Sequence, residues 1–518
     1  MSDRLAVQNG VVDELDHEPV VDGLDREPAK KKSVLKKIAG ILWDTLDESS
    51  KEEQRLVLKL DSIFLAWACF YYFVMYLDST NVSNAYVSGM QQDLGLYGDQ
   101  LNWLNTYRTI GYIIGTMPSQ FILMRVRPSL FLPCLELVWS LFVLGMGFAK
   151  NVETMYGLRF MIGLCESAAY PGMMTLLGSW YTPRELAKRS VIYQQSSAVA
   201  QMFSGFLQAG IYHGLDGASG RPGWRWLFIF DFIIGAPIAI LGFIIIPDSP
   251  TNTRAFWLKP TDRVVALERM ERQGRAPPAK LTWQKVFKFC TDWPIVFLIP
   301  YICFVTALDI AAFMNLWLKS LHKYSVEKIN EIPTGGYALE IVTALIFAIY
   351  ADYTGQRWVV ITAAGLLGMI GGIILSAQSS NVSATFAGWY FTFMPVGAGA
   401  ILFAWVNELC QSNAEQRGFM IGLLNTIAYV FSAFLPLLIY PSSKAPNYPV
   451  GYKVNAVFWV IFALGGPVGW FLAKRYPRES TKGVVAEASS DISHDDGNDK
   501  NATTTDIEGG EKFIPPMN

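Results

Sequence analysis

Long apolar runs alternate with short polar segments along most of this chain. Each run is long enough to cross about 30 Å of hydrocarbon as a helix, which takes roughly 20 residues. Six runs precede a hydrophilic stretch and six follow it. The pattern predicts an all-α membrane protein with twelve transmembrane helices in two six-helix pseudo-repeats. The predicted spans are about 62–78, 101–124, 130–148, 154–180, 190–212, 225–246, 294–318, 333–350, 358–377, 384–406, 417–440 and 453–473.

The polar segments divide the chain into five predicted parts. These are an N-terminal tail (1–60), a first six-helix bundle (61–246), a central loop (247–293), a second bundle (294–473) and a disordered C-terminal tail (474–518). Within the N-terminal tail, apolar residues recur at helical spacing from Val34 to Leu46, beside two lysines. That pattern fits a helix on the membrane surface or a short soluble helix equally well.

Composition and charge agree with a lipid-facing surface. Only 17% of the 518 residues are charged and 52% are hydrophobic, whereas soluble domains are nearer 25% charged. A net charge of -2 argues against a nucleic-acid partner. Lys and Arg gather in the N-terminal tail and the central loop, but the loop Ser79–Gln100 has neither. Because cytoplasmic segments collect Lys and Arg, we expect both termini and the central loop in the cytoplasm.

Three lysines run against this topology, because the loop that carries them should lie outside: Lys319, Lys323 and Lys328. The six cysteines are scattered without a C-x-x-C spacing, and the four histidines lie outside the apolar runs. We therefore expect no metal site and no cofactor. The runs also contain no nucleophile–base motif, so we do not expect an enzyme.

Two stretches together carry a family resemblance. They are LDSTNVSNAYVSGMQQDL (Leu77–Leu94) and LRFMIGLCESAAYPGMMTLLGSWYTPRELAKRS (Leu158–Ser190). They resemble the fungal allantoate and vitamin permeases, the anion:cation symporter branch of the major facilitator superfamily. Members similar to pantothenate permeases are the nearest. The likeness extends from about Trp43 to about Arg478.

This resemblance implies a monomeric multi-pass transporter of the plasma membrane. It implies proton-coupled uptake of a small organic anion, such as pantothenate or a related vitamin or carboxylate, by alternating access. Its partners would be that anion, protons and the bilayer. Nothing in the sequence fixes the direction of transport. An exporter of a secondary metabolite and a nutrient sensor with a transporter fold therefore remain alternatives.

Charges inside the apolar runs are the candidates for chemistry, because each costs at least about 2.5–3.5 kcal/mol at the bilayer centre. They are Arg108, Glu136, Arg159, Glu166 and Asp231 in the first half, and Asp309, Glu340 and Glu408 in the second. Arg159 and Glu166 are seven residues apart and share a helix face. Arg159-x-x-x-Gly163 also matches the fourth-helix motif that the superfamily associates with proton coupling. We predict a proton-coupling role for both, with fixed ion pairs between helices as the alternative.

Substrate-binding candidates come from both halves: Asp78, Arg108, Asp309, Tyr72 and Trp405. Family members often have Asp-Arg where this chain has Asp78-Ser79, so Arg108 could supply the missing cation near the outer mouth. The alternative is a salt bridge between Asp78 and Arg108.

Two further patterns have more general readings. Asn381-Val-Ser383 is a glycosylation sequon in a predicted outer loop. The glycines of Gly111-x-x-x-Gly115 are expected to permit close helix packing.

Overall fold

The computed structural model describes residues 50–123, 125–272, 283–377, 381–410 and 414–476. These residues are helical with no strand among them, as the apolar pattern predicts. The described residues all fall in one compact unit. The helix predicted at Val34–Leu46 lies outside the described residues.

The first half begins with a long helical stretch from Lys51 to Asp93, which starts before the predicted span and ends after it. A kink at Gly89, with a φ of 115°, interrupts it near its end. The elements of this half are α2 (Lys51–Lys59), η2 (Leu60–Leu65), α3 (Ala66–Ala85), η3 (Tyr86–Met90), α4 (Gln91–Asp93), α5 (Gln100–Leu123), α6 (Pro128–Met146), α7 (Val152–Glu166), α8 (Ala169–Trp180), α9 (Pro183–Leu215), η4 (Ala218–Gly220) and α10 (Gly223–Ile245).

The second half follows two loop helices, α11 (Pro260–Arg272) and α12 (Trp283–Thr291). Each predicted span coincides with helix, although 62–78, 154–180, 294–318 and 384–406 are divided into shorter helices. The elements are η5 (Trp293–Phe297), α13 (Leu298–Leu308), η6 (Asp309–Phe313), α14 (Met314–Ser320), α15 (Val326–Glu331), α16 (Thr334–Thr354), α17 (Arg357–Ser376), α18 (Val382–Phe393), α19 (Ala398–Leu409), α20 (Ala414–Ile439), η7 (Ser442–Lys444) and α21 (Gly451–Arg475).

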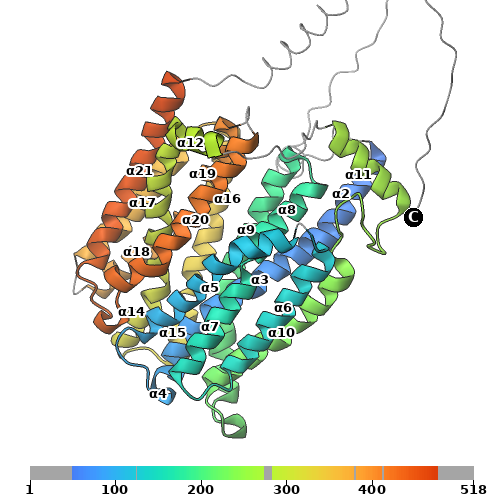
Figure 1. Cartoon of the computed structure of the whole chain (residues 1–518). Coiled ribbons are helices and arrows are strands. Elements are labelled where there is room, and N and C mark those ends of the chain that lie inside the picture. The colour runs from blue at the N-terminus through green and yellow to red at the C-terminus, as the bar shows by residue number, and fades with distance from the viewer. Residues whose placement is uncertain (1–49, 124, 273–282, 378–380, 411–413, 477–518) are drawn as a thin grey trace, which may run out of the picture. The chain divides into compact units, whose positions relative to one another are not determined.

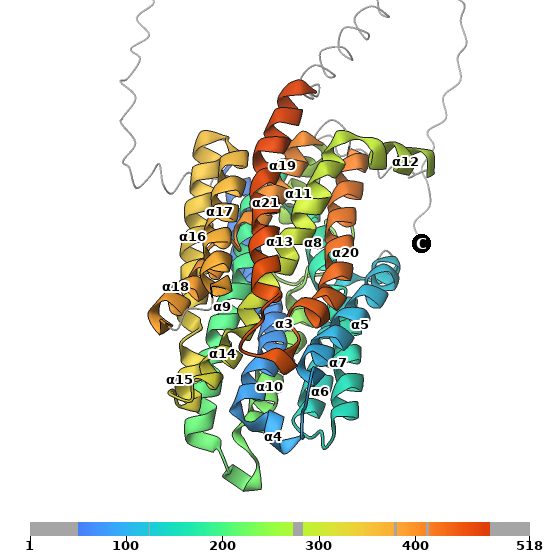
Figure 2. The same cartoon turned by 90° about the vertical axis from the view of Figure 1, so that its left-hand side faces the viewer.

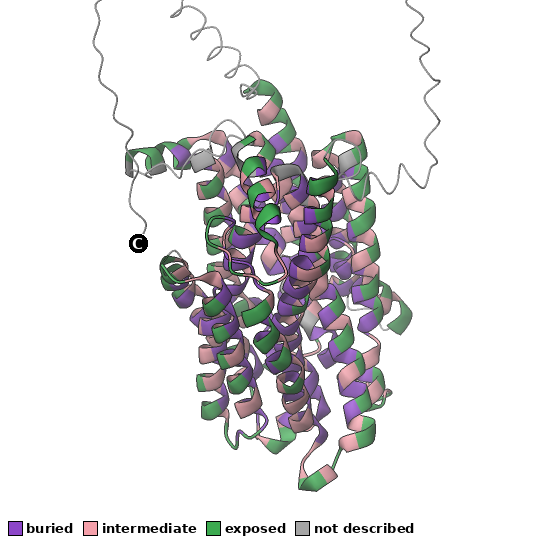
Figure 3. Cartoon of the chain, turned by 90° about the vertical axis from the view of Figure 1, so that its right-hand side faces the viewer, coloured by how far each residue is buried: buried purple, intermediate pink, exposed green. Residues whose placement is uncertain are grey.

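Exposed residues recur along the outward faces of the helices (Figure 3). On α16, Val342, Leu345, Ile346 and Ile349 are 44–57% exposed and recur at the spacing of one helix face. A soluble protein rarely exposes so continuous an apolar stripe. Because lipid tails are as apolar as these side chains, the stripe is stable only against a bilayer.

Nine helical stretches within the described residues are long and apolar enough to cross a membrane. The helices α5 and α9 are long but more polar. Both carry amides and hydroxyls on a face turned to the interior, among them Asn105 and Thr109 on α5 and Gln194 and Ser197 on α9. These two helices are less apolar because one face of each lines the cavity, while exposed apolar side chains such as Met117 on α5 and Phe206 on α9 cover the other face.

Packing is densest within each half (Figures 1 and 2). In the first half α3 lies against α9 and α10, α6 against α7 and α10, and α5 against α7. In the second half α17 lies against α18 and α21, and α13 against α20 and α21. The halves meet where α9 packs on α15 and α16 and where α5 packs on α20.

The two ends of the bundle differ in character. We call the end that carries α11 and α12, at the top of Figure 1, the loop-helix end, and the opposite end the α15 end. At the loop-helix end α11 is tied to the first half by ion pairs. Arg269 lies 2.6 Å from Glu185 on α9, and Lys59 on α2 lies 2.6 Å from Asp262.

Candidate functional site

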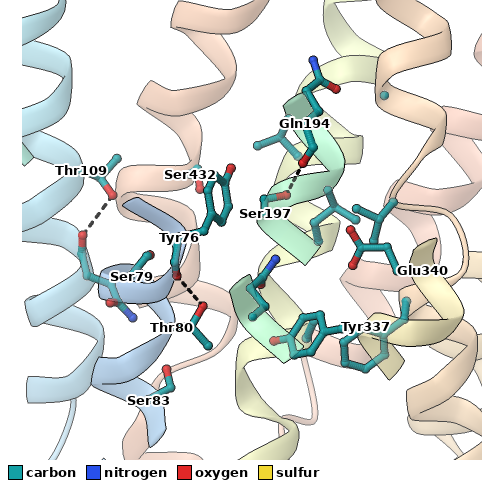
Figure 4. Close-up of a pocket in the computed structure, with 18 of the residues that line it drawn as sticks. Tyr76, Ser79, Thr80, Ser83, Thr109, Gln194, Ser197, Tyr337, Glu340 and Ser432 are labelled. Atoms are coloured by element: carbon teal, nitrogen blue, oxygen red, sulfur yellow. Dashed lines mark hydrogen bonds between the residues drawn. The ribbon is translucent and has the colours of Figure 1, made fainter. Parts of the chain in front are cut away.

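A cavity of about 440 Å³ lies between the two halves, which is within the range of small-ligand sites. Its walls come mainly from α3, α5 and α9 in the first half and from α13, α16, α19 and α20 in the second. Figure 4 shows how polar the lining is. Hydroxyl, amide, phenol and charged groups line it, among them Ser79, Thr80, Asn105, Gln194, Gln201, Tyr337 and Ser432.

Glycines bring α5 and α7 into backbone contact beside this cavity. A Cβ at Gly163 would overlap the carbonyl oxygen of Arg108, and a Cβ at Gly111 would overlap that of Phe160. At Gly115 a Cβ would lie 2.6 Å from the carbonyl oxygen of Leu164. This is the close approach that small residues allow between membrane helices.

The close approach pairs two charges across the α5–α7 contact. Arg108 Nη2 lies 2.6 Å from Glu166 Oε2, and the two side chains are 16% and 0% exposed. Arg108 also lines the cavity, whereas Glu166 is fully buried and lies outside the cavity lining. The salt bridge that we considered between Asp78 and Arg108 does not form. Asp78 is buried outside the cavity lining, and its oxygens have no hydrogen-bond partner among the described residues.

Arg159 lines the same wall and is 1% exposed. Its guanidinium donates to neutral acceptors, the carbonyl oxygen of Leu104 at 3.4 Å and Asn105 Oδ1 at 3.2 Å. Arg159 and Glu166 are therefore close but not paired. Two buried guanidinium donors, Arg159 Nη1 and Arg108 Nε, have no partner in the described part of the chain.

The other predicted site residues differ in whether they line the cavity. Tyr72 lines the cavity, with its ring stacked 4.4 Å from that of Tyr193. Trp405 does not line it, because its ring packs 5.0 Å from Phe297 in the core of the second half. Asp309 begins η6, but its side chain lies outside the described residues.

The sequon residue Asn381 is exposed at the start of α18. Its side-chain oxygen accepts from the backbone N–H groups of Ser383 and Ala384, so it caps the helix.

A chain of buried hydrogen bonds was not predicted. Asn81 on α3 donates to Asp231 on α10 and accepts from Ser204 on α9. Asn84 donates to the same hydroxyl at 2.6 Å and accepts from Asn315 on α14 at 2.7 Å. Asn81 and Asn84 lie in the segment Ser79–Gln100, which we predicted to be a loop, but α3 continues to Ala85 and both amides are buried. Buried amides need partners, but the sequence pattern did not indicate that these two are buried.

That chain reaches across to the second half, and further hydrogen bonds between the halves accompany it toward the α15 end. Asn330 donates to Ser88 Oγ at 3.0 Å, and Asn102 donates to the carbonyl oxygen of Tyr440 at 2.9 Å. Lys319 donates to Gln91 at 2.9 Å. These bonds hold the two halves together on that side of the cavity.

Charges at the loop-helix end pair in similar ways in both halves. Arg127 lies 2.5 Å from Asp248 in the first, and Arg357 lies 2.5 Å from Glu408 in the second. These arginines fall in the corresponding loops after the second and eighth predicted helices. Glu408 is thus at a helix end rather than in the cavity.

Comparison with known proteins gives one family. A model of the Major Facilitator Superfamily matches residues 68–436. The chain is 39% identical over 409 residues to the MFS transporter PfmaC of Pestalotiopsis fici, covering 77% of this chain and 76% of that protein. It is 30% identical over 407 residues to the pantothenate transporter liz1 of Schizosaccharomyces pombe, covering 78% and 79%.

A second pantothenate transporter, FEN2 of Saccharomyces cerevisiae, is 31% identical over 411 residues, covering 77% of this chain and 80% of that protein. Among solved structures, an inward-facing, unoccupied bacterial homolog of the human lysosomal transporter Spinster superposes with a TM-score of 0.57. Its sequence identity is 14%, over 82% of this chain and 98% of that one.

Proposed function

The chain belongs to the Major Facilitator Superfamily and is a transporter rather than an enzyme, and from that premise we propose that it takes up a small organic anion together with protons. Pantothenate or a related vitamin is the proposed substrate, because two relatives at 30% and 31% identity are named pantothenate transporters. Alternating access between the two halves is the proposed mechanism.

The unfilled guanidinium donors support an anionic substrate most directly. Arg159 Nη1 and Arg108 Nε are buried beside the cavity without a partner in the described residues. A buried donor without a partner costs about 1–3 kcal/mol. A carboxylate bound at this wall would supply the acceptor that Arg159 lacks through a charge-assisted hydrogen bond, and Arg suits such recognition because of its planar fork of N–H groups.

From the sequence we expected Arg159 to couple protons and Arg108 to bind substrate, and the contacts of the two arginines favour the reverse assignment. Arg108 is the partner of Glu166, so we assign this pair to proton coupling. Arg159 meets only neutral hydrogen-bond acceptors, so we assign it to the substrate carboxylate. Tyr72 is proposed to line the binding site beside it.

Electrostatics then links the proton to the anion. Glu166 is ion-paired with Arg108, so its negative charge offsets one of the two arginines. When Glu166 takes up a proton, the net charge of Arg108, Arg159 and Glu166 together rises by one, which favours binding of the anion. If the Glu166 carboxylate and the substrate carboxylate are about 6 Å apart, they repel each other by about 3 kcal/mol at an effective dielectric constant of about 20. One proton would then strengthen anion binding by up to about a hundredfold.

We place the loop-helix end in the cytoplasm of a plasma-membrane monomer, because basic residues gather there. The hydrogen bonds at the α15 end would then close the outer side of the cavity. Glycosylation at Asn381, which lies on the same outer side in this topology, is part of the proposal.

Uptake of radiolabelled pantothenate in a pantothenate-auxotrophic host tests the proposal. We expect uptake to rise as the outside pH falls and to collapse with a protonophore. Arg159→Gln should raise the apparent Michaelis constant, and Glu166→Gln should abolish the dependence on pH. Release of preloaded pantothenate without uptake would indicate an exporter and contradict the proposal.

A further inference from the structure

The cavity wall of the second half carries a carboxylate that the proposed mechanism does not use. Glu340 on α16 lines the cavity and is 4% exposed. Figure 4 shows it with Tyr337 on one side of the cavity, while Ser79 and Thr109 lie on the other. The arginines and Glu340 therefore come from opposite halves.

Glu340 lacks the compensation that Glu166 has. Within the described residues Glu166 lies 2.6 Å from Arg108, whereas no Lys, Arg or His forms an ion pair with Glu340. A buried carboxylate is an acceptor with about four lone-pair positions, and burying it without donors is costly. Because Glu340 lines the cavity, a ligand that enters the cavity can supply donors to this carboxylate.

A second carboxylate would be repelled at this position, which limits the class of substrate. Like charges brought together disfavour the wrong ligand. Nearby cavity residues on α9, Gln194, Ser197 and Gln201, offer amides and a hydroxyl but no charge. The cavity is thus polarised, from guanidinium donors in the first half to a carboxylate acceptor in the second.

We propose that Glu340 is a specificity-determining residue that accepts a hydrogen bond from a hydroxyl or N–H group of the substrate, at the end remote from the substrate's carboxylate. The substrate class is then a carboxylate that carries hydrogen-bond donors at its other end. Plain apolar carboxylates and dicarboxylates fall outside this proposed substrate class. The inference rests on the proposed function and narrows its substrate.

Pantothenate and a matched analogue provide the test. Pantothenate has a carboxylate at one end and two hydroxyls at the other, and the analogue has both hydroxyls replaced by hydrogen. Each competes, unlabelled, against uptake of radiolabelled pantothenate by the full-length protein. In the unaltered protein the analogue should bind at least about tenfold more weakly, because it leaves the buried carboxylate without a donor.

Glu340→Gln should reduce this ratio to about twofold, because a neutral amide accepts a weaker hydrogen bond. Glu340→Asp, which keeps the charge, should retain most of the preference. Glu136→Gln is the matched control, since Glu136 is a fully buried carboxylate on α6 outside the cavity lining. It should leave the ratio unchanged.

Three results would overturn the inference. The first is equal affinity of the unaltered protein for both compounds, which needs no variant to fold. The second is a Glu340→Gln variant that weakens both compounds by the same factor. The third is a Glu340→Gln variant that keeps the preference for pantothenate over the analogue but whose uptake no longer depends on external pH. That result would make Glu340 a proton carrier. Absence of any carboxylate uptake by the unaltered protein would instead remove the proposed function, and this inference with it.

Discussion

Replacing Gly163 with alanine should separate α5 from α7 and disturb the Arg108–Glu166 pair. The new Cβ would overlap the Arg108 carbonyl oxygen and lie 2.8 Å from its carbonyl carbon. Both atoms are backbone, so neither can rotate away. The overlap with the oxygen is the more severe, so α5 must move by more than the roughly 0.6 Å that would bring the carbonyl carbon alone to ordinary contact near 3.4 Å.

That movement has a cost in stability and in transport. Overpacking of this kind costs about 1–3 kcal/mol. A shift larger than about 0.6 Å would also lengthen the 2.6 Å ion pair beyond about 3.2 Å, past the limit of a good hydrogen bond. We expect a lower melting temperature in detergent and a loss of about tenfold or more in the uptake rate of pantothenate at matched expression.

Gly157 on the same helix is the matched control. A Cβ there would meet nothing within 4 Å, and alanine is preferred over glycine within a helix by about 1 kcal/mol. Gly157→Ala should therefore be neutral or slightly stabilising. If Gly163→Ala melts at the same temperature as Gly157→Ala and transports as well, the argument from backbone contact is wrong.

Three further predictions concern charges and hydrogen bonds. Arg108→Gln should cost about 3 kcal/mol, because it leaves a buried charge unpaired; adding Glu166→Gln should restore the melting temperature, and no recovery would contradict the pairing. Asn315→Ala removes a hydrogen bond between the halves worth about 1 kcal/mol. A membrane-impermeant thiol reagent added at the α15 end should therefore label a cysteine introduced into the cavity wall about fivefold faster than it does without this substitution. Arg269→Gln should lower the melting temperature because its ion pair is buried, whereas Arg272→Gln, at an exposed position, should not.

The helices were predictable because the bilayer imposes a length of about 20 apolar residues on each span. The pattern could not tell which apolar face points to lipid, since the interior of such a bundle is as apolar as its surface. Trp405 illustrates the limit. It is deep in the bundle as expected, but the rotation of its helix turns it into the core of the second half.

The pairing of charges was harder to predict than their presence. Arg159 and Glu166 share a helix, and Asp78 and Arg108 lie on consecutive predicted helices, so sequence distance favoured those pairs. The observed partner of Arg108 is set by the contact of α5 with α7, which depends on Gly111 and Gly163. The spacing Gly111-x-x-x-Gly115 predicted a close helix contact, but it could not tell which helix would make it, because such contacts join residues that are far apart in the sequence.

The two loop helices belong to different halves, and this gives the molecule a built-in pair of reporter positions. The helix α11 is tied to α2 and α9 by ion pairs, whereas α12 packs against α20 and η5. Cys290 on α12 is already exposed. One fluorophore can be attached to Cys290 and a second to a cysteine introduced on α11, once the other exposed thiol, at Cys134, is removed. Rocking of the halves would then change the energy transfer between the two fluorophores. Single molecules could be followed through the transport cycle in this way without labelling the cavity.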